Sequence, residues 1–315
     1  MDTTVIVTPV YEDNEASSRL FQELANVFGS KLYIVAVDDG SVYQPVDVEN
    51  IEAAGTQGVV IKLKRNVGHQ RAIAIGLSYV DKNIGQAKHV VVMDSDGEDL
   101  PDSIKDLVQF LDSEQVDMVV AERKSRVETL RFRAFYIIYK VIFRFLSGRR
   151  ISFGNFMALK PAAVKRLVAM QELWIHVAAC ALTSKLRIAR CSLDRGPRYA
   201  GQSKMNFVGL ALHGFKGLMV FAEDVLVRVG IACSLVAALS IIGSVIAIAL
   251  KLFGFATPGW FSVALGILLL VFLQTGALTL MTLMLTGVVK GGTVTTADYK
   301  EFIDTVIHAS NSAEN

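Results

Sequence analysis

Residues 1–122 alternate short apolar runs with longer amphipathic stretches. Apolar runs bounded by turn residues favour buried strands, and apolar residues at helical spacing favour helices. This alternation predicts a doubly wound α/β sheet, in which helices cover both faces of mostly parallel strands. The predicted strands are Val5–Pro9, Leu32–Val37, Gly58–Leu63, Val90–Met93 and Asp117–Ala121, and the predicted helices are Ser17–Phe28 and Arg71–Val80.

Two long runs without charge lie towards the carboxyl end. No Asp, Glu, Lys or Arg occurs in 229–250 or in 252–289, and Lys251 alone separates the two runs. A helix needs about 20 apolar residues to cross a bilayer. We therefore expect a membrane hairpin with spans at about 229–250 and 260–288. The alternative is a buried helical hairpin of a soluble protein, but such helices seldom avoid charge for so long.

The charges that flank the two spans predict their orientation. Lys216 and Arg228 precede the first span and Lys290 follows the second, whereas the link contains only Lys251. Cytoplasmic segments carry the excess of Lys and Arg, so both termini are expected in the cytoplasm. The first 80 residues contain no secretory signal pattern, which agrees with that orientation.

Two amphipathic segments precede the hairpin. Residues 130–147 and 206–224 combine Phe, Tyr and Leu with Arg and Lys. Helices of this composition lie in the membrane interface, so interfacial contact is expected from both, the second forming an amphipathic helix over 205–227. Alternatively, either helix packs its apolar face on its own domain.

Composition agrees with lipid contact, and charge is divided unevenly along the chain. Hydrophobic residues make up 52% of the chain, which is high for a purely soluble protein. Residues 1–122 carry 9 basic and 21 acidic side chains, residues 123–228 carry 20 and 5, and the remainder carries 3 and 4. The acidic part suits binding through a cation, and the basic part suits phosphates or an anionic membrane. No nucleic-acid partner is expected, because bulky apolar residues interrupt the basic stretch.

The strand Val90–Met93 ends in a cluster of carboxylates. Ligands bind to open α/β sheets where parallel strands end, so this cluster lies at an expected active-site edge. Asp94, Asp96 and Glu98 alternate along the chain, and their hard oxygens are the ligands that Mg²⁺ or Mn²⁺ prefers, so we expect them to bind metal. The alternative is a helix start, and Asp99 is expected to be the helix N-cap in either case.

Polar residues follow the first two strands as well. Thr8, Pro9 and Tyr11 close the first strand, and Asp38 and Asp39 close the second. All would gather along the same edge, where a nucleotide can lie across the sheet. Asp39 is then placed to accept hydrogen bonds from a base or ribose. A turn-forming Asp-Gly pair needs no ligand, so a purely structural role for both acids stays open.

Five motifs occur in order along the chain. They are TPVYEDNE at 8–15, VDDGS at 37–41, RNVGHQ at 65–70, MDSDGEDLP at 93–101 and RYAGQSK at 198–204. Together with the hairpin that follows, they resemble the motifs of polyprenyl-phosphate glycosyltransferases of glycosyltransferase family 2, such as dolichol-phosphate mannose synthase and the bactoprenol glucosyltransferases. The resemblance covers nearly all of residues 1–290 and implies a nucleotide-diphospho-sugar transferase (GT-A, Rossmann-like) fold.

The resemblance also implies roles for individual residues. The nucleotide pocket is expected to comprise Pro9, Tyr11, Asp39, Gly68 and Asp94. The acceptor phosphate is expected to contact Arg195, Arg198, Ser203 and Lys204, with a solvated basic loop as the alternative. The catalytic set is Asp96, Arg123, Asn155, Arg198 and Lys204, with Asp96 as a direct metal ligand and Arg123 near the diphosphate or acceptor.

The chain departs from the family at one site. The family commonly carries Gly-Asp-Phe-Arg where this chain has Gly-Asn-Phe-Met at 154–157, and an arginine-rich stretch where it has 173–176. A carboxylate that could act as a general base is therefore missing. A phosphate acceptor, with a second pKa of about 6, is mostly dianionic and can attack an anomeric carbon without first losing a proton. We expect Asn155 to orient the sugar or the acceptor.

These observations lead to one hypothesis for the activity. An integral-membrane enzyme would move a hexose from a nucleotide diphosphate sugar to undecaprenyl or another polyprenyl phosphate, with inversion at the anomeric carbon. Glucose from UDP-glucose is the expected donor, and Mg²⁺ or Mn²⁺ is the expected cofactor. The enzyme would act at the cytoplasmic face of a bacterial-type cytoplasmic membrane, and the hairpin could support a homo-oligomer.

The expected organisation places a cytoplasmic glycosyltransferase domain at 1–204, the amphipathic helix, the hairpin at 228–290 and a cytoplasmic tail at 291–315. Two other functions stay open. An apolar strand followed by Asp-x-Asp-Gly also begins aspartyl-phosphate phosphohydrolases, in which Asp94 would be the nucleophile. A non-catalytic lipid-translocation subunit is the other alternative, although the hairpin contains no ionisable residue to mark a transport path.

Overall fold

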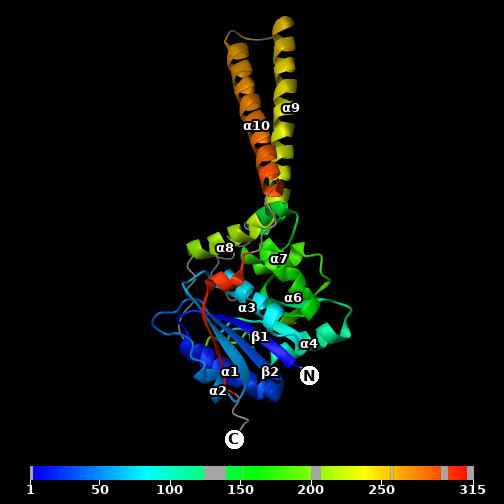
Figure 1. Ribbon diagram of the computed structural model, residues 1–315. Helices are drawn as coiled ribbons and strands as arrows, with labels where there is room; N and C mark the ends of the chain where they lie inside the picture. The colour runs from blue at the N-terminus through cyan, green and yellow to red at the C-terminus, as the bar shows by residue number, and fades with distance from the viewer. Residues whose placement is uncertain are drawn as a thin grey trace. The chain divides into compact units, whose positions relative to one another are not determined.

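The computed structural model describes residues 3–123, 140–150, 152–199, 207–255, 257, 259–291 and 297–310. The chain forms two compact units (Figure 1). The sheet unit comprises Met1–Arg133, Ile151–Val220 and Thr295–Asn315, and the hairpin unit comprises Ala134–Arg150 and Phe221–Val294.

The described strands of the sheet unit form one mixed sheet of eight strands in the order β7-β5-β6-β4-β1-β2-β3-β8. The four central strands, β4, β1, β2 and β3, are parallel, whereas β6 and β8 run antiparallel to their neighbours. The five predicted strands are confirmed, and β6, β7 and β8 were not predicted. The strands are β1 (Thr3–Val10), β2 (Leu32–Asp38), β3 (Gln57–Leu63), β4 (Ala87–Val92), β5 (Met118–Arg123), β6 (Phe153–Leu159), β7 (Ile188–Leu193) and β8 (Ile303–His308).

Helices cover both faces of the sheet, which explains why its central strands are apolar on both sides. One core contains side chains from α3, α6 and α7, and the other contains side chains from α1 and α4. The two predicted helices are confirmed as α1 and α3. The helices of this unit are α1 (Asn14–Phe28), α2 (Glu49–Ala53), α3 (His69–Asn83), α4 (Ser103–Ser113), α6 (Pro161–Val168), α7 (Val177–Thr183) and α8 (Phe207–Met219), with short 3₁₀ turns η1 (Gly29–Lys31), η2 (Gln171–Trp174) and η3 (Tyr299–Phe302).

The carboxyl ends of the parallel strands meet at one edge, as expected. Val10 pairs with Asp38, and the backbone N–H of Asp39 donates to the Val10 carbonyl at 2.8 Å. On the other side of β1, the Met93 N–H donates to Val7 at 3.2 Å. The acids that follow β2 and β4 therefore flank the end of β1.

The tail after the hairpin belongs to the sheet unit. β8 pairs with β3 from Val59 to Leu63, and the ring of Phe302 lies 5.6 Å from that of Trp174. The Glu52 carboxylate accepts hydrogen bonds from the N–H and hydroxyl of Ser310. Both segments that flank the hairpin are thus parts of the same compact unit.

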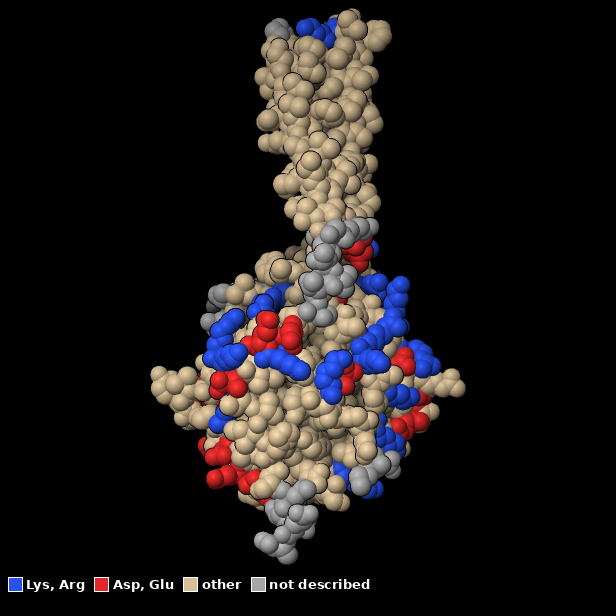
Figure 2. All heavy atoms as spheres, viewed as in Figure 1, with Lys and Arg blue, Asp and Glu red and all other residues tan. Residues whose placement is uncertain are grey.

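The hairpin unit contains α9 (Ala222–Leu252) and α10 (Trp260–Gly291), which pack against each other. Both helices are long and apolar enough to cross a membrane. In the most apolar stretch of each helix, only 11% and 0% of the residues are buried. Core helices of a soluble protein would be mostly buried, so that alternative is not supported. Figure 2 shows no charged side chain on the visible side of the helical hairpin between its two ends.

Each of the two segments expected at the membrane interface was predicted as one helix, and the described residues show a different arrangement for each. The first ten residues of 130–147 lie outside the described residues, whereas 140–147 are helical, and Phe143 packs edge-on against Phe221. Val141 and Phe145 on this helix are exposed. The second segment, 206–224, is divided between α8 and the start of α9, because the chain turns at 220–221.

Candidate active site

Four of the residues expected to bind a nucleotide line one pocket at the sheet edge. Pro9 lies at the end of β1 and Tyr11 follows that strand, Asp39 follows β2, and Gly68 precedes α3. We name this the Asp39 pocket. Its lining residues are Pro9, Val10, Tyr11, Asp39, Asn66, Gly68 and His69.

Main-chain groups hold the acids of the Asp39 pocket. The Asp39 carboxylate is buried and accepts hydrogen bonds from the N–H groups of Val67 at 2.7 Å and Gly68 at 3.0 Å. Burial raises the pKa of Asp39, although these two hydrogen bonds oppose the rise. Asp38 accepts from the N–H groups of Ser41 and Val46, so it has the structural role that an Asp-Gly turn allows.

The same loop requires glycine at position 40. Gly40 has a φ of +71°, and a Cβ there would lie 2.4 Å from the Arg65 carbonyl carbon. An L side chain is strained at this φ and would also collide with the 65–66 backbone. The close approach keeps the Val67 and Gly68 amides within reach of Asp39.

The carboxylates after β4 form a tight loop rather than a helix cap. The Asp99 carboxylate accepts a hydrogen bond from the Asp94 N–H at 3.1 Å. α4 begins only at Ser103, and its N-cap position is Asp102. The expectation that Asp99 caps this helix is therefore wrong, because the chain makes an extra turn before α4 and Asp99 closes the loop instead.

Two arginines from the segment after β7 bind this loop. Arg198 pairs with Asp96 at 2.8 Å, through Nη2, and with Glu98 at 3.1 Å, through Nε. Arg195 forms an ion pair with the other oxygen of Glu98. The structure thus brings the expected metal ligands and two expected phosphate ligands together. Burial raises the pKa of Asp96, as do the charges of Asp94 and Glu98, whereas the hydrogen bond from the Glu98 N–H and the charge of Arg198 lower it.

Backbone contacts fix the arginine segment on the carboxylate loop. The N–H groups of Gly196 and Tyr199 donate to the carbonyls of Glu98 and Asp96 at 3.0 and 2.9 Å. Gly97 has a φ of +84°, and a Cβ on it would lie 2.6 Å from the Tyr199 ring. Only glycine allows the ring to lie this close.

The donor set fits a divalent cation only in part. Among the described residues, no group of three or more His, Cys, Asp or Glu side chains is placed to share an ion. Both Glu98 oxygens contact arginines, so metal binding by Glu98 would require the release of both ion pairs, and its role as a ligand stays a prediction. Asp94 and Asp96 do fit, since their side chains are 27% and 15% exposed and Mg²⁺ is usually held by one or two carboxylates together with substrate phosphates.

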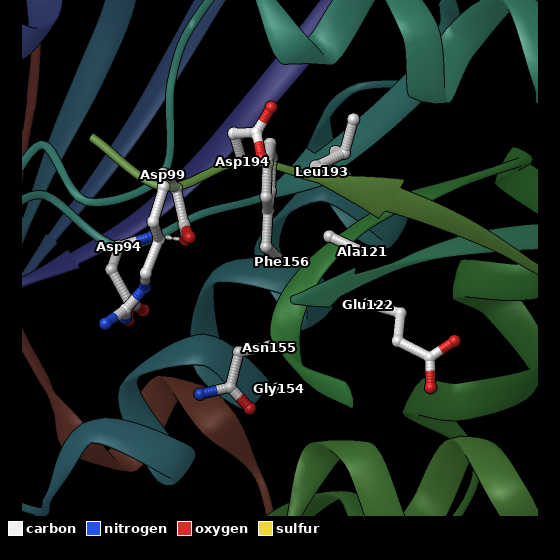
Figure 3. A pocket seen from close by; sticks show the side chains of 10 residues that line it. Asp94, Asp99, Ala121, Glu122, Gly154, Asn155, Phe156, Leu193 and Asp194 are labelled. Carbon is white, nitrogen blue, oxygen red and sulfur yellow. Dashed lines mark hydrogen bonds between the residues drawn. The ribbon is translucent and has the colours of Figure 1, made fainter. Parts of the chain in front are cut away.

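A second pocket lies beside Asp94, and we name it the Asp94 pocket. Asn155 points into it from β6, with the hydrogen-bonded pair of Asp94 and Asp99 nearby (Figure 3). Gly154, Asn155 and Phe156 thus form one wall, at the position where a carboxylate was expected from the family. Its lining residues are Asp94, Asp99, Ala121, Glu122, Gly154, Asn155, Phe156, Leu193, Asp194 and Arg195.

His69 joins the two pockets. It lines the Asp39 pocket, and its Nε2 lies 3.2 Å from Asp94 Oδ1 and 3.0 Å from Asn155 Nδ2. Burial lowers the pKa of His69, but the carboxylates of Asp94, Asp39 and Asp96 together outweigh burial and raise it. Gln70 supports this arrangement, since it donates to Asn155 at 3.2 Å and accepts from the Val177 N–H at 2.7 Å.

Some expected site residues cannot be placed, and some placed residues were not expected. Arg123 ends β5, but its side chain is outside the described part of the chain, as are Ser203 and Lys204. Sequence reasoning gave no role to His69 or Gln70. Both lie in the motif RNVGHQ, so their polar character at the start of α3 was the available signal.

Comparison with known proteins agrees with this geometry. The family model "Glycosyl transferase family 2" matches residues 5–174, more than half of the chain. The undecaprenyl-phosphate 4-deoxy-4-formamido-L-arabinose transferase of Edwardsiella ictaluri is 26% identical over 80% of this chain and 73% of its own length. An uncharacterized glycosyltransferase of Synechocystis is 27% identical over 69% of each chain.

Solved structures support the fold. Glucosyl-3-phosphoglycerate synthase from Mycobacterium tuberculosis, in complex with Mn²⁺, UDP and phosphoglyceric acid, has a TM-score of 0.51 at 14% identity, covering 72% of this chain and 78% of that one. Its complex with Mn²⁺ and UDP-glucose has the same TM-score at 14% identity, covering 71% and 79%. The expected GT-A fold is confirmed, and the chain is a glycosyltransferase that belongs to glycosyl transferase family 2.

Proposed function

We propose that this glycosyltransferase moves a hexose from a nucleotide diphosphate sugar to the phosphate of a polyprenyl lipid. UDP-glucose is the first candidate donor and undecaprenyl phosphate the first candidate acceptor. The family match and the Edwardsiella relative, which is named for transfer of an arabinose derivative with undecaprenyl phosphate, support sugar transfer to a polyprenyl phosphate. They favour it over a phosphohydrolase with Asp94 as nucleophile and over a non-catalytic translocation subunit.

The observation that carries the proposal is the meeting of opposite charges at one sheet edge. Asp94 and Asp96 present carboxylates there, and Arg198 contacts Asp96 from the neighbouring segment. The Asp39 pocket adjoins this edge through His69. A nucleotide in the Asp39 pocket would direct its diphosphate to Asp94 and Asp96 and its sugar towards Asn155.

Asp94 and Asp96 would hold a divalent cation, Mg²⁺ or Mn²⁺, together with the diphosphate. Such an ion neutralises negative charge on the departing nucleotide. Arg195 and Arg198 would then bind phosphate oxygens, because guanidinium groups match phosphate geometry. Arg123, Ser203 and Lys204 would complete the set of phosphate contacts.

Asn155 supports a phosphate acceptor. Its amide cannot accept a proton from a nucleophile, and it faces the pocket that contains Asp94. A phosphate monoester is mostly dianionic above a pH of about 6 and needs no general base. Attack from the side opposite the departing nucleotide would invert the anomeric carbon.

The apolar helices support an acceptor that resides in a membrane. α9 and α10 would cross the bilayer as a hairpin, because both flanking segments belong to the sheet unit. Lys216 and Arg228 before the hairpin favour a cytoplasmic location for that unit. The phosphate of a polyprenyl lipid would then be available at the membrane surface where the site operates.

One observation favours a second candidate function. An imidazole paired with a carboxylate, as in His69 and Asp94, can act as a general base. Such a base would suit an acceptor hydroxyl. A lipid alcohol is therefore the alternative acceptor class.

The test incubates the purified full chain with nucleotide sugars and three acceptors: undecaprenyl phosphate, undecaprenol and diacylglycerol. UDP-glucose and UDP-4-deoxy-4-formamido-L-arabinose belong in the donor panel. The proposal predicts a glycolipid from undecaprenyl phosphate that requires Mg²⁺ or Mn²⁺ and disappears with EDTA. Product from the alcohols alone would assign the second candidate, and no product from any donor with any lipid would refute both.

A further inference from the structure

α8, the yellow-green helix in Figure 1, has two distinct faces within the sheet unit. Leu212, Phe215, Lys216 and Met219 follow helical spacing along one face, and the three apolar side chains among them are 56%, 64% and 62% exposed. Gly214 and Gly217 are buried, and α8 contacts α7. The helix therefore presents an apolar stripe with one cation to the outside while another face packs inward.

His213 lies on the inward side and stacks on a second histidine. The centroids of the His213 and His176 rings are 4.5 Å apart, and the rings are tilted by 38°. His176 is the N-cap of α7, and its Nδ1 accepts the Ala179 N–H at 3.2 Å. Burial, and then His213, lowers the pKa of His176 to about 3. His213 is thus supported by a neutral ring whose orientation is fixed.

His213 also lies close to the candidate active site. Burial, then His69 and Lys216, lower the pKa of His213, whereas Asp94 raises it. His176, on which His213 stacks, directly precedes Val177. The Val177 N–H donates to Gln70 at 2.7 Å, and Gln70 donates to Asn155 at 3.2 Å, so the histidine pair lies behind the wall of the Asp94 pocket. A neutral imidazole offers one N–H donor.

We propose that His213 donates a hydrogen bond to the phosphate of the acceptor, and that the stripe of Leu212, Phe215 and Met219 contacts the acceptor's prenyl chain. This inference rests on the proposed function, because it assigns residues to a lipid-phosphate acceptor. Phosphate at His213 and hydrocarbon along the stripe would place the polar head near Asp94 and the apolar chain outside. Lys216 adds a positive charge along the same helix, which favours an anionic lipid.

The experiment measures the KM of the full chain for undecaprenyl phosphate and for the nucleotide sugar in H213F and H213Q. Phenylalanine keeps a ring to stack on His176 but donates no hydrogen bond, whereas glutamine keeps an N–H donor. H213F should raise the KM for lipid phosphate by about tenfold or more, the loss expected for one hydrogen bond to a charged group. The KM for nucleotide sugar should change less than about twofold, and H213Q should fall between wild type and H213F.

The stripe is tested with F215S, using undecaprenyl phosphate and a prenyl phosphate of two isoprene units. The longer acceptor should lose affinity in F215S, whereas the shorter one should not. H308Q, which changes an exposed histidine on β8, is the matched control and should leave both KM values unchanged.

The possible results distinguish the role of His213 from the transfer activity itself. Transfer by the wild type with an unchanged lipid-phosphate KM in H213F would overturn the role of His213 alone. Equal rises in both KM values would identify His213 as a structural residue and would also overturn it. An absence of transfer by the wild type to any lipid phosphate would refute the proposed function together with this inference.

Discussion

The two pockets at the sheet edge are built in different ways. Main-chain amides of Val67 and Gly68 hold the Asp39 carboxylate, and a glycine packed on the 65–66 backbone keeps those amides in place. Beside the Asp94 pocket, the Glu98 N–H holds one Asp96 oxygen at 3.0 Å, but the other Asp96 oxygen and both Glu98 oxygens are held by the side chains of Arg195 and Arg198. Backbone contacts form with the fold, whereas side-chain ion pairs can exchange partners without unfolding it.

This difference indicates how each pocket would respond to its ligand. The Asp39 pocket is already formed, so a base or ribose would bind with little rearrangement. At the Asp94 pocket, a cation and a diphosphate would compete with Arg198 for Asp96. The arginines released from Asp96 and Glu98 would then be available to phosphate, so donor binding would prepare the site for the acceptor.

The largest effect is expected from D96N. Asparagine keeps the shape of the side chain but removes the charge that the cation requires, so transfer should fall by about a hundredfold to a thousandfold. Initial rates at saturating Mg²⁺ or Mn²⁺ measure this loss, and the thermal midpoint checks that the protein is folded. D102N is the matched control, because Asp102 is 83% exposed and forms an ion pair with Lys105. Wild-type rates in D96N would remove Asp96 from the reaction.

D39N should damage the backbone-built pocket. Its amide nitrogen would face the N–H of Val67 or Gly68, so one buried hydrogen bond would be lost at a cost of about 1–3 kcal/mol. The KM for nucleotide sugar should rise about tenfold, with a lower thermal midpoint and little change in the KM for lipid phosphate. A normal KM for nucleotide sugar would show that Asp39 has only the structural role.

E98Q distinguishes the two roles considered for Glu98. If Glu98 only retains the arginines, neutralising it should lower the KM for lipid phosphate about twofold to fivefold, because an exchangeable ion pair is worth about 0.5–1 kcal/mol. The metal requirement should stay unchanged, and a titration of activity against Mn²⁺ measures it. A loss of metal activation as severe as in D96N would identify Glu98 as a ligand.

A pH dependence of stability is expected from His176, which precedes Val177, the residue whose N–H donates to Gln70 behind Asn155. His176 has a pKa of about 3 in the folded protein and 6.5 as its ordinary value, so the unfolded chain binds more protons between these limits. Stability is therefore complete above pH 6.5 and falls as the pH decreases towards 3, by at most about 1.4 kcal/mol per pH unit.

H176N tests this pH dependence, because asparagine can still cap α7 but does not titrate. Thermal unfolding of the two proteins between pH 7 and 5 provides the measurement. The wild type should lose more stability than H176N on acidification. Parallel losses in both proteins would assign the pH dependence to other groups.

The sequence allowed the parallel centre of the sheet to be predicted, but not the edge strands β7 and β8 or the interior antiparallel strand β6. The runs Val5–Pro9 and Val90–Met93 are apolar because both faces of β1 and β4 are buried, and local pattern reports such burial. β8 pairs with β3, which lies more than 200 residues earlier in the chain. No local pattern identifies that pairing, so the tail was expected to be a separate segment.

The sequence predicted which residues belong to the candidate site better than it predicted which of them contact one another. Pro9, Tyr11, Asp39 and Gly68 do line one pocket, because parallel strand ends must meet at one edge. The ion-pair partner of each charged side chain depends on loop conformations, and these are set by contacts between residues distant in the sequence. Asp99 therefore closes a loop instead of capping α4, and Glu98 binds two arginines.

The central claim is that Asp96 and its neighbour Asp94 hold a divalent cation together with a nucleotide diphosphate. Electron paramagnetic resonance of Mn²⁺, titrated with and without UDP, tests this directly on the wild type, D96N and D102N. The wild type and D102N should bind Mn²⁺, and UDP should strengthen this binding. D96N should lose it. Equal Mn²⁺ binding in D96N and the wild type, with UDP present, would contradict the central claim.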